Sequence, residues 1–523
     1  MIQYVCLLFL ILFSSCGKQE PVQRQTARFA LTADPTMLDP RKARDLDGVT
    51  IIHMLFEGLT RTSRTGEPEL ALAKSVEISD DGLRYVFHLR KSFWSNGDRL
   101  TAHDFCNSWR TILDPKFPTD IAYQLYPIKN ARKSKLGELG VETVGVQALD
   151  EQTLVVELEQ PVPYFLELVT MTSFFPVPIK VVENEQWHLT PETLVSNGPF
   201  TLKTWNHSNQ LTMSKNLRYW EASEVKLTSV DLYIATPDTA LQMFEEGKLD
   251  WTGSPLSMIP ADAIRELKKS QRLQISPFLA TYFYRVNTNP LIGNKSNPLA
   301  DANFRRALSF AIDRNAIVTH VLQGGHTAAM SLIPPEMRLK GGGYSSGEAP
   351  NFPALDEPIT ISYSNTERNA SVAQSVQKQW ESALGIHVRL EAVEPKVFFQ
   401  RVSKREYQIA AGSWSADFND PVNFLEVFKY KEGSTNNTGW ESAEYVDLLN
   451  RSAICKPGEE RDQVMRKAEA ILMEQLPIIP VFHFVLNYVK KPELEGVALS
   501  PSGQLDLRWA YFKPTSRTAG EKR

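Results

Sequence analysis

The sequence predicts an α/β protein with two lobes. Its 523 residues are too many for one ordinary hydrophobic core and enough for two or three. Residues 230–252 and 359–393 each show the pattern of strand, helix and strand, which forms parallel sheets covered on both faces. More than a hundred residues of mixed pattern separate the two units. This separation favours two α/β lobes over one continuous sheet.

Apolar periodicity and closing glycines place the elements of these two units. Gly247 closes the helix of the first unit, and Gly385 ends the helical stripe of the second. The predicted strands cover residues 230–235, 249–252, 359–363 and 386–393, and the predicted helices cover residues 239–246 and 372–384.

Three β-hairpins are predicted before residue 215. Asp80-Asp81-Gly82 is a strong turn signal in the first hairpin, and Asn197-Gly198-Pro199 opens the third. The second alternates apolar and polar residues around Asp150-Glu151-Gln152. The predicted strand pairs are 75–79 with 83–89, 144–149 with 153–158, and 200–205 with 210–214.

A helix between the first two hairpins has clear ends. Thr101 and Asp104 have the spacing of a capping box, and Asp114-Pro115 stops the helix. The other predicted elements are a strand over 28–33, a helix over 46–56, an amphipathic helix over 304–322, a loop over 341–353, a strand over 407–411, a long helix ending near residue 475 and a strand over 477–482.

The N-terminus has the pattern of an export signal. Residues 5–13 are an unbroken apolar run, too short to span a bilayer and of the length found in signal peptides. Ser14-Ser15-Cys16-Gly17 resembles the lipobox of bacterial lipoproteins, in which the cysteine is acylated, although Phe13 replaces the usual leucine and no basic residue precedes the run. The alternative is a cleaved signal peptide with an incidental cysteine. Residues 1–15 are thus predicted as signal peptide, and 16–26 as lipidated Cys16 and tether.

Composition and motifs argue against several classes of function. The net charge is −4 and no cluster of Lys or Arg occurs, so a nucleic-acid or anionic-membrane partner is not expected. The metalloprotease, nucleophile-elbow, P-loop and dinucleotide motifs are absent, and the nine histidines are dispersed. We therefore expect no catalytic residue, cofactor or metal. Cys106 and Cys455 are either free buried thiols or a long-range disulfide.

One local cluster, residues 412–421, carries candidate binding chemistry. It follows the predicted strand over 407–411, and ligand loops of α/β lobes lie at the carboxyl ends of strands. Asp417 offers an acceptor for a cation, and Trp414 offers an apolar wall. The alternative is an ordinary turn in which Asp417 caps the backbone and Trp414 belongs to the core.

The chain resembles the peptide, nickel and oligopeptide receptors of ABC importers. Nine short motifs carry this resemblance in the correct order over nearly the whole mature chain. They are Leu38-Asp39-Pro40, Phe56-Glu57-Gly58-Leu59, Phe87-His88-Leu89-Arg90, Trp94-Ser95-Asn96-Gly97, Thr101-Ala102-His103-Asp104-Phe105, Asn197-Gly198-Pro199-Phe200, Asn216-Leu217-Arg218-Tyr219-Trp220, Phe304-Arg305-Arg306-Ala307-Leu308 and Trp414-Ser415-Ala416-Asp417-Phe418-Asn419-Asp420-Pro421.

The resemblance implies a two-lobed periplasmic-binding-protein fold, of the large type II class, with an extra hairpin-rich subdomain. It also implies an extracytoplasmic, monomeric receptor that closes on a short peptide and delivers it to the transmembrane permease subunits of the importer. The expected divisions are lobe I (27–58, 190–278 and 486–515), the hairpin subdomain (59–189) and lobe II (279–485).

The resemblance further suggests site residues. In peptide-binding members the aspartate in the place of Asp417 pairs with the ligand's α-ammonium, with Trp414 beside it and the peptide read as an added strand. The remaining candidates for ligand contact are Ser413, Ser415, Tyr282 and Asp34. Ser415 also stands where some members have a disulfide cysteine.

One departure leaves recognition of the ligand's carboxylate open. Well-known members have an arginine just before the tryptophan segment, where this chain has Ala410 and Ala411. Arg401 and Arg405 are candidates to replace it, or they belong to a solvated helix face. Alternative ligands are a nickel chelate, a heme, an oligosaccharide or a cell-wall peptide, and alternative classes are an exported hydrolase or a chaperone.

Overall fold

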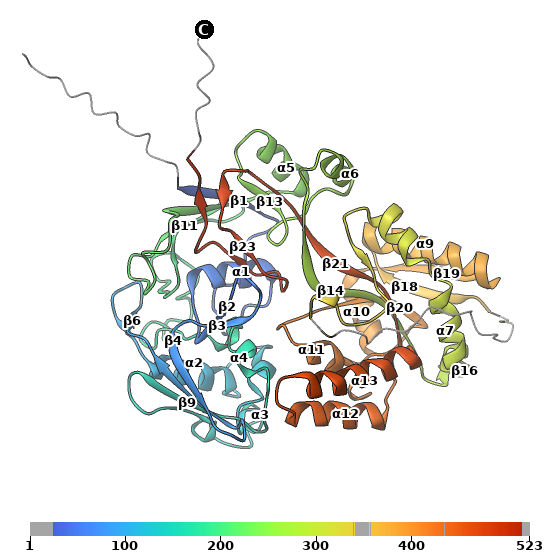
Figure 1. Ribbon diagram of the computed structural model, residues 1–523, viewed down its shortest axis with the longest axis horizontal. Coiled ribbons are helices and arrows are strands. Elements are labelled where there is room, and N and C mark those ends of the chain that lie inside the picture. Colours follow the sequence, from blue (N-terminus) through green and yellow to red (C-terminus); the bar gives the residue numbers. More distant parts are fainter. Residues whose placement is uncertain (1–24, 338, 340–354, 356, 434, 515–523) are drawn as a thin grey trace, which may run out of the picture.

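Two lobes lie side by side in the protein, joined by long strands (Figure 1). The computed structural model describes residues 25–337, 339, 355, 357–433 and 435–514. The predicted signal peptide, Cys16 and the loop over 341–353 therefore lie outside the described residues, apart from residues 25 and 26 of the tether. No helix in the described part is long and apolar enough to cross a membrane.

Lobe I holds one end of the main sheet. Its principal elements are β1 (Thr26–Leu31), α1 (Leu46–Leu55), β10 (Phe200–Asn206), β11 (Gln210–Lys215), β12 (Ser229–Ile234), α5 (Pro237–Glu245), β13 (Trp251–Gly253) and α6 (Ala261–Lys269). Strands β12 and β13 flank β1 in parallel and α5 crosses between them, which confirms the first strand–helix–strand unit. The predicted hairpin is also confirmed, because β10 and β11 pair antiparallel.

The hairpin subdomain is built around a separate four-stranded sheet. Its principal elements are β2 (Thr60–Thr62), β3 (Pro68–Leu70), β4 (Ala73–Ile78), β5 (Arg84–Leu89), α2 (Ala102–Leu113), β8 (Val146–Ala148), β9 (Thr153–Glu157) and α4 (Phe165–Leu168). The strand order β4-β5-β9-β8 unites the two predicted hairpins in one sheet. Helix α2 has the predicted capping box, in which the Thr101 backbone N–H donates to Asp104 at 2.7 Å.

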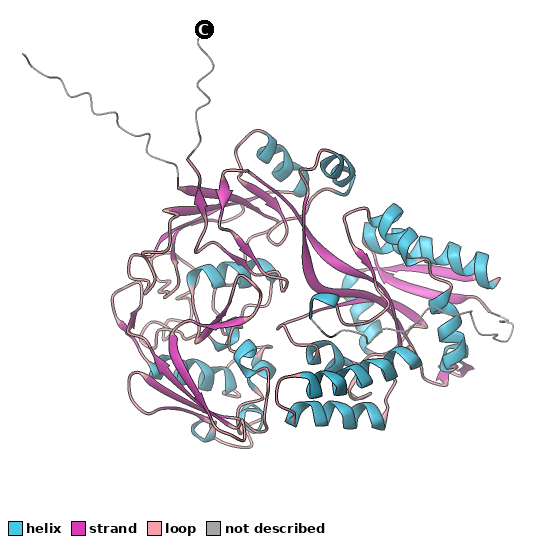
Figure 2. Cartoon of the chain, viewed as in Figure 1, coloured by secondary structure: helices cyan, strands magenta, loops and turns pink. Residues whose placement is uncertain are grey.

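Lobe II has helices on both faces of its sheet (Figure 2). Its principal elements are α7 (Ala302–Phe310), β18 (Ile359–Ser364), α9 (Glu367–Leu384), β19 (Val388–Val393), α10 (Pro395–Ser403), β20 (Ile409–Ser415), α11 (Val422–Leu425), α12 (Ala443–Ile454) and α13 (Glu459–Gln475). Strands β18 and β19 pair in parallel around α9, which confirms the second strand–helix–strand unit.

The expectation of two separate sheets is wrong. One 11-stranded sheet runs through both lobes in the order β10-β11-β12-β1-β13-β21-β14-β20-β18-β19, and its eleventh strand, β17 (Thr327–Ala328), pairs with β21 beside this path. The strands that cross between the lobes are β14 (Gln274–Val286) and β21 (Ile478–Lys490), an antiparallel pair whose 13 residues each span about 40 Å. Their pairing shifts register between Pro277 and Thr281, so the sheet is irregular where it leaves lobe I.

The apolar cores remain separate although the sheet is continuous. One large buried cluster extends from lobe I into the hairpin subdomain. Lobe II has its own clusters, the largest of which lie on the two faces of its sheet. In the described chain, the partly buried Tyr164 and Phe418 pack against both the lobe I cluster and a lobe II cluster.

The predicted helix over 304–322 is wrong as one element. Helix α7 ends at Phe310, and a short helix (Arg314–Ala316) and a π-helical turn (Ile317–Leu322) follow. Asp313 starts the new segment by accepting a hydrogen bond from the Ala316 N–H at 2.9 Å. The Arg314 side chain donates to the Ser309 and Pro480 carbonyls, which fixes the break against β21. A local cap therefore overrides a continuous amphipathic pattern.

The two cysteines in the described residues are both free. Cys106 is buried in α2 of the hairpin subdomain, and Cys455 follows α12 in lobe II. Burial raises the pKa of the Cys106 thiol to about 11, so it stays protonated and unreactive at neutral pH.

Candidate functional site

Asp417 lines a pocket that both lobes border. It lies two residues beyond the end of β20, so the carboxyl end of that strand carries it into the space between the lobes. The pocket opens to solvent, and the atom-free space in and around it is about 270 Å³. Its walls are Asp417, Phe418 and Asn419 from lobe II, Ser502 and Gln504 from lobe I, and Thr62, Gly66, Pro68, Glu167 and Thr170 from the hairpin subdomain.

The Asp417 carboxylate has no cationic partner among the described residues. The side chain is still in contact with solvent, but the surrounding protein removes enough water to raise its pKa. A hydrogen bond with Asn423 opposes this rise. A cation placed beside Asp417 would compensate the cost of desolvation, so the site is suited to a positively charged group.

Trp414 supports the Asp417 loop from inside lobe II. Its indole N–H donates to the Asn423 side-chain oxygen at 2.8 Å, and the Asp417 backbone N–H donates to the same oxygen at 3.4 Å. The half-buried ring packs against the lobe II core. Trp414 therefore packs against the core and supports the loop. It is not among the residues that line the Asp417 pocket, and its contact with a ligand stays a prediction.

Strand β20 has an edge without a paired strand in the described chain next to Asp417, although the Arg285 guanidinium donates to the Ala411 carbonyl at 3.5 Å. Its full length pairs with β14, but on the other side only Ile409 and Ala410 pair with β18. Within the described chain, residues 411–415 thus have a strand on one side only. Ser413 and Ser415 lie in this stretch and are exposed. The predicted strand extends further than expected, into the segment interpreted as a loop.

The structure does not bring Asp34 or Tyr282 to the Asp417 pocket. Asp34 accepts hydrogen bonds from the Trp205 indole at 3.0 Å and from the Ser208 N–H, and so holds the turn between β10 and β11. Tyr282 is 3% exposed and stacks on Phe482 in the lobe II core, with ring centroids 4.8 Å apart. Both side chains have structural contacts here.

Arg401 and Arg405 are also occupied elsewhere. Arg401 on α10 forms an ion pair with Glu391 at 2.7 Å. Arg405 follows α10 and donates to the carbonyls of Lys431 and Asn436. Neither arginine lines the Asp417 pocket, and a contact of either one with the ligand's carboxylate stays a prediction.

Direct contacts between the lobes surround the pocket. Tyr164 of the hairpin subdomain stacks on Phe418 of lobe II, with ring centroids 4.8 Å apart and planes inclined by 5°. The Asn419 side-chain amide donates to the Gly66 carbonyl at 3.3 Å. The lobes therefore meet at the loop that carries Asp417, and a ligand bound there would touch both.

The family model for bacterial extracellular solute-binding proteins, family 5, matches residues 67–436, which is more than half of the chain. The chain belongs to this family. The match includes β20, Asp417 and three of the pocket-lining residues of the hairpin subdomain, Pro68, Glu167 and Thr170.

Relatives of this family 5 protein match along nearly its whole length. The oligopeptide-binding protein OppA of Bacillus subtilis is 36% identical over 97% of this chain and 98% of its own. The unliganded open form of the periplasmic murein tripeptide-binding protein MppA superimposes with a TM-score of 0.80, at 28% identity over 94% of this chain and 97% of its own. OppA of Haemophilus influenzae in complex with the peptide RPPGFSPFR superimposes with a TM-score of 0.73, at 28% identity over 94% of this chain and 99% of its own.

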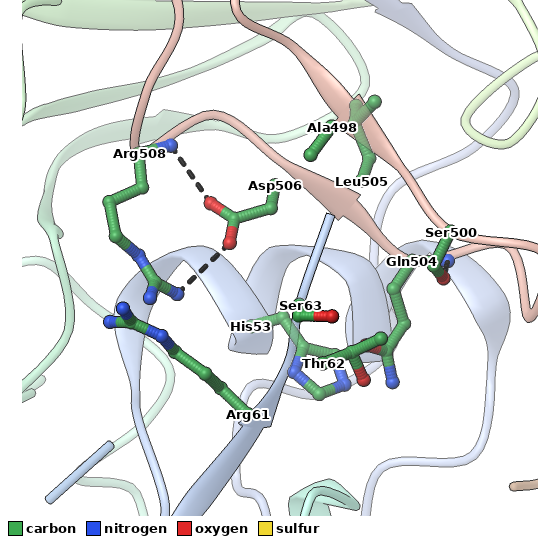
Figure 3. Close-up of a pocket in the computed structure, with 10 residues that line it drawn as sticks. All are labelled: His53, Arg61, Thr62, Ser63, Ala498, Ser500, Gln504, Leu505, Asp506 and Arg508. Atoms are coloured by element: carbon green, nitrogen blue, oxygen red, sulfur yellow. Dashed lines mark hydrogen bonds and ion pairs between the residues drawn. The ribbon is translucent and has the colours of Figure 1, made fainter. Parts of the chain in front are cut away.

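A second cavity of this family 5 protein lies between lobe I and the start of the hairpin subdomain and is lined by paired charges (Figure 3). Arg508 contacts Asp506 through its backbone N–H at 2.8 Å and its guanidinium at 3.0 Å. Arg508 and Arg61 each also pair with the buried Glu57 at 3.2 Å. Burial and the nearby Arg508 charge lower the pKa of His53 to about 4, so it is neutral. The ion pair of Arg508 with Glu57 fastens the C-terminal segment that carries Arg508 to the residues after α1.

Two further charged residues, Glu167 and Arg368, are candidates for ligand contact that the sequence patterns did not identify. Glu167 on α4 lines the Asp417 pocket from the opposite lobe. Arg368 lies in the first turn of α9, with its guanidinium 5.4 Å from the Phe484 ring centre and close enough to Tyr282 for their charges to interact. Both occur in ordinary helical segments, and no local sequence signal separates them from surface charges.

Proposed function

We propose that this family 5 solute-binding protein captures short peptides between its lobes and delivers them to an ABC importer. The observation that carries the proposal is a carboxylate, Asp417, that has no cationic partner among the described residues and lies in a pocket between the lobes, just beyond the end of β20. A peptide's α-ammonium fits the carboxylate, and its backbone fits the strand edge. The peptide ligands of OppA relatives support the same assignment.

The peptide backbone pairs with residues 411–415 of β20. Addition of a strand to an exposed edge satisfies backbone N–H and C=O groups of both partners without reading side chains. Binding by main-chain hydrogen bonds suits a receptor that accepts many sequences. Ser413 and Ser415, which are small and exposed, leave space for ligand side chains on their face of the sheet.

Arg368 receives the ligand's terminal carboxylate. Tyr282 lies directly opposite Ser413 in the β14–β20 ladder, so their side chains share a face, and Arg368 interacts with Tyr282 on that face. Burial lowers the pKa of the Arg368 guanidinium, and no carboxylate pairs with it in the described ranges. The N-terminus of α9, an 18-residue helix, adds partial positive charge at the same place.

Replacing Arg368 with methionine should weaken binding of peptides with a free carboxylate by about 10- to 100-fold, because a charge-assisted hydrogen bond is lost. Peptide amides should bind both proteins alike. Isothermal titration calorimetry of a tripeptide and its amide measures this, with the exposed Lys378→Met on the same helix as the control. Equal weakening of acid and amide would contradict the role of Arg368.

Peptide capture closes the lobes about the strand pair β14–β21. The domain divisions proposed from the resemblance, at residues 278/279 and 485/486, fall within these two strands. A ligand that contacts Asp417 in lobe II and the hairpin subdomain favours the closed form, because only that form makes both sets of contacts. The closed receptor then docks on the permease subunits of the importer.

The mature receptor is a monomer outside the cytoplasm, held to the membrane by acyl chains on Cys16. The lipobox-like segment before Cys16 and the polar tether after it support this anchoring. Mass spectrometry of the protein purified from membranes tests it: a diacylated or triacylated Cys16 N-terminus is expected, and an unmodified N-terminus elsewhere would overturn it.

Binding of defined peptides tests the proposed function directly. The purified protein should bind Ala-Ala-Ala with a free amine, and native mass spectrometry should detect peptides that copurify with it. Nickel chelates, heme and oligosaccharides serve as competing ligands in the same titration. Tight binding of one of these without any peptide binding would overturn peptide capture.

A further inference from the structure

The Asp417 pocket contains a second carboxylate, that of Glu167, which the proposed pairing of Asp417 with an α-ammonium does not involve. Glu167 lies on α4 in the hairpin subdomain, on the opposite side of the pocket from Asp417. None of the described residues forms an ion pair or side-chain hydrogen bond with the Glu167 carboxylate. Its charged or titratable neighbours are Glu67, Asp420, Arg461 and Tyr85, and both guanidinium nitrogens of Arg461 that face an acid are already bound to Asp420.

A third acceptor in the same pocket is also without a donor. The Asn419 side-chain oxygen is fully buried and has no hydrogen-bond partner in the described structure. Its amide nitrogen is used to bind the Gly66 carbonyl, so the oxygen is fixed in place. Among the described residues that line the pocket, none is Lys, Arg or His. Asp417 and Glu167 thus place two carboxylates without a cationic partner among the described residues in one pocket, and the complementary ligand is positively charged.

The two carboxylates reach the pocket from different lobes, Asp417 from the loop after β20 and Glu167 from α4 of the hairpin subdomain. Asp420 raises the pKa of Glu167. One ammonium group bound at Asp417 would therefore leave Glu167 uncompensated. A ligand with a second positive charge close to its α-amine would satisfy both.

We propose that Glu167 receives the side-chain cation of the ligand's first residue, so that this receptor prefers peptides that begin with Lys, Arg or another diamino acid. This inference rests on the proposed function, in which Asp417 holds the α-ammonium. The side chain of a first residue begins one bond from the carbon that carries the amine, so it reaches the wall opposite Asp417. Glu167 thereby also adds a contact from the hairpin subdomain when the lobes close.

The preference should depend on pH. Burial raises the pKa of Glu167 to about 7 in the empty pocket, and a side-chain cation binds its ionised form. Below that pKa, binding must first release a proton, so affinity for a basic first residue increases as pH increases. Between pH 6 and pH 8 the ratio of the affinities for Lys-Ala-Ala and Ala-Ala-Ala should increase up to about tenfold. The ratio cancels the titration of the α-amine that both peptides share.

The test compares three tripeptides by calorimetry on the full receptor: Lys-Ala-Ala, Ala-Ala-Ala and norleucine-Ala-Ala. Norleucine has the length of lysine without its charge. The wild-type protein should bind Lys-Ala-Ala about tenfold more tightly than either of the others. Glu167→Gln, which keeps the shape, should remove this preference, so that Lys-Ala-Ala and norleucine-Ala-Ala bind it with equal affinity. Glu185→Gln, an exposed acid of the same subdomain, is the charge-matched control and should retain the preference.

Three other outcomes separate failure of the Glu167 role from failure of peptide capture itself. If Ala-Ala-Ala binds but Lys-Ala-Ala has no advantage, the role of Glu167 is refuted and peptide capture stands. If Glu167→Gln weakens all three peptides equally, Glu167 acts on lobe closure and not on the first residue. If no peptide binds the wild-type protein, the proposed function itself fails. Glu167→Asp, with an unchanged melting temperature as the criterion of folding, replaces Glu167→Gln if the latter does not fold.

Discussion

Asp417→Asn is expected to weaken binding of peptides with a free α-amine by about a hundredfold or more, because an amine buried without its counter-ion costs about 3–5 kcal/mol. The asparagine keeps the shape of the side chain and removes only its charge. The loss arises when the lobes close over the ligand, since closure excludes the water that would otherwise solvate the ammonium. Calorimetry with Ala-Ala-Ala measures it.

Acetylated peptides separate this effect from general damage to the cleft. They lack the cation, so the wild-type protein and Asp417→Asn should bind them with the same, weak affinity. The exposed Asp447→Asn in lobe II removes the same charge away from the pocket and should leave all affinities unchanged. Equal loss for free and acetylated peptides would refute the pairing of Asp417 with the amine.

Asp417→Asn should not destabilise the ligand-free protein. Desolvation already raises the pKa of Asp417, and no cation among the described residues compensates the charge. Removing the charge therefore removes an unfavourable interaction rather than a favourable one. We expect a melting temperature equal to or above that of the wild type, as differential scanning calorimetry would report.

Elements with local signals were predicted well from the sequence. The hairpin turn at Asp80-Asp81-Gly82 and the capping box at Thr101 depend on residues within a few positions, and both are present. The same holds for the helix that Gly385 ends, because Gly385 adopts the left-handed conformation that favours glycine, with φ of 67°. Such signals need no knowledge of distant contacts.

The continuous sheet could not be predicted because its key pairing is distant in sequence. Strands β14 and β21 lie about 200 residues apart, and each shows only an apolar run that suits either lobe. The break after α7 has a similar cause. Arg314 makes its contacts with Pro480 on β21, which periodicity within residues 304–322 does not reveal.

Within the candidate site, too, residues in a local motif were predicted and residues brought together by the fold were not. Asp417 was predicted because its neighbours along the chain form a recognisable motif, and the structure places it in the pocket. Glu167 becomes a candidate only because the hairpin subdomain meets lobe II at the Asp417 pocket. Arg368 becomes one only because α9 packs near Phe484 of β21 and Tyr282 of β14. Asp34 illustrates the reverse case, because its contacts with Trp205 and Ser208 require a hairpin 170 residues away that sequence patterns do not connect to it.

Arg461→Met should destabilise lobe II by about 3–5 kcal/mol, because it leaves the buried Asp420 carboxylate without a counter-ion. Arg461 binds Asp420 through two parallel contacts of 2.6 and 2.9 Å, and both side chains are about nine-tenths buried or more. Urea denaturation followed by tryptophan fluorescence measures the change in the free energy of unfolding.

A double variant distinguishes a broken ion pair from lost packing. Arg461→Met combined with Asp420→Asn removes both charges, so it should recover much of the stability that the single change loses. Arg466→Met on the same helix breaks an exposed ion pair with Glu459 and should cost less than about 1 kcal/mol. A double variant as unstable as Arg461→Met would show that packing, and not the charge of Asp420, dominates.

The same ion pair should affect ligand binding through the position of Asp417. Asp420 accepts a hydrogen bond from the Val422 N–H at 2.9 Å and so anchors the loop three residues from Asp417. The Arg461 guanidinium also lies 5.7 Å from the ring centre of Tyr164, whose ring contacts Phe418 from the opposite lobe. Arg461→Met should therefore weaken binding of free-amine peptides more than binding of acetylated ones, even under conditions where the variant is fully folded. Unchanged affinity for both would mean that Trp414 and Asn423 alone hold Asp417 in place.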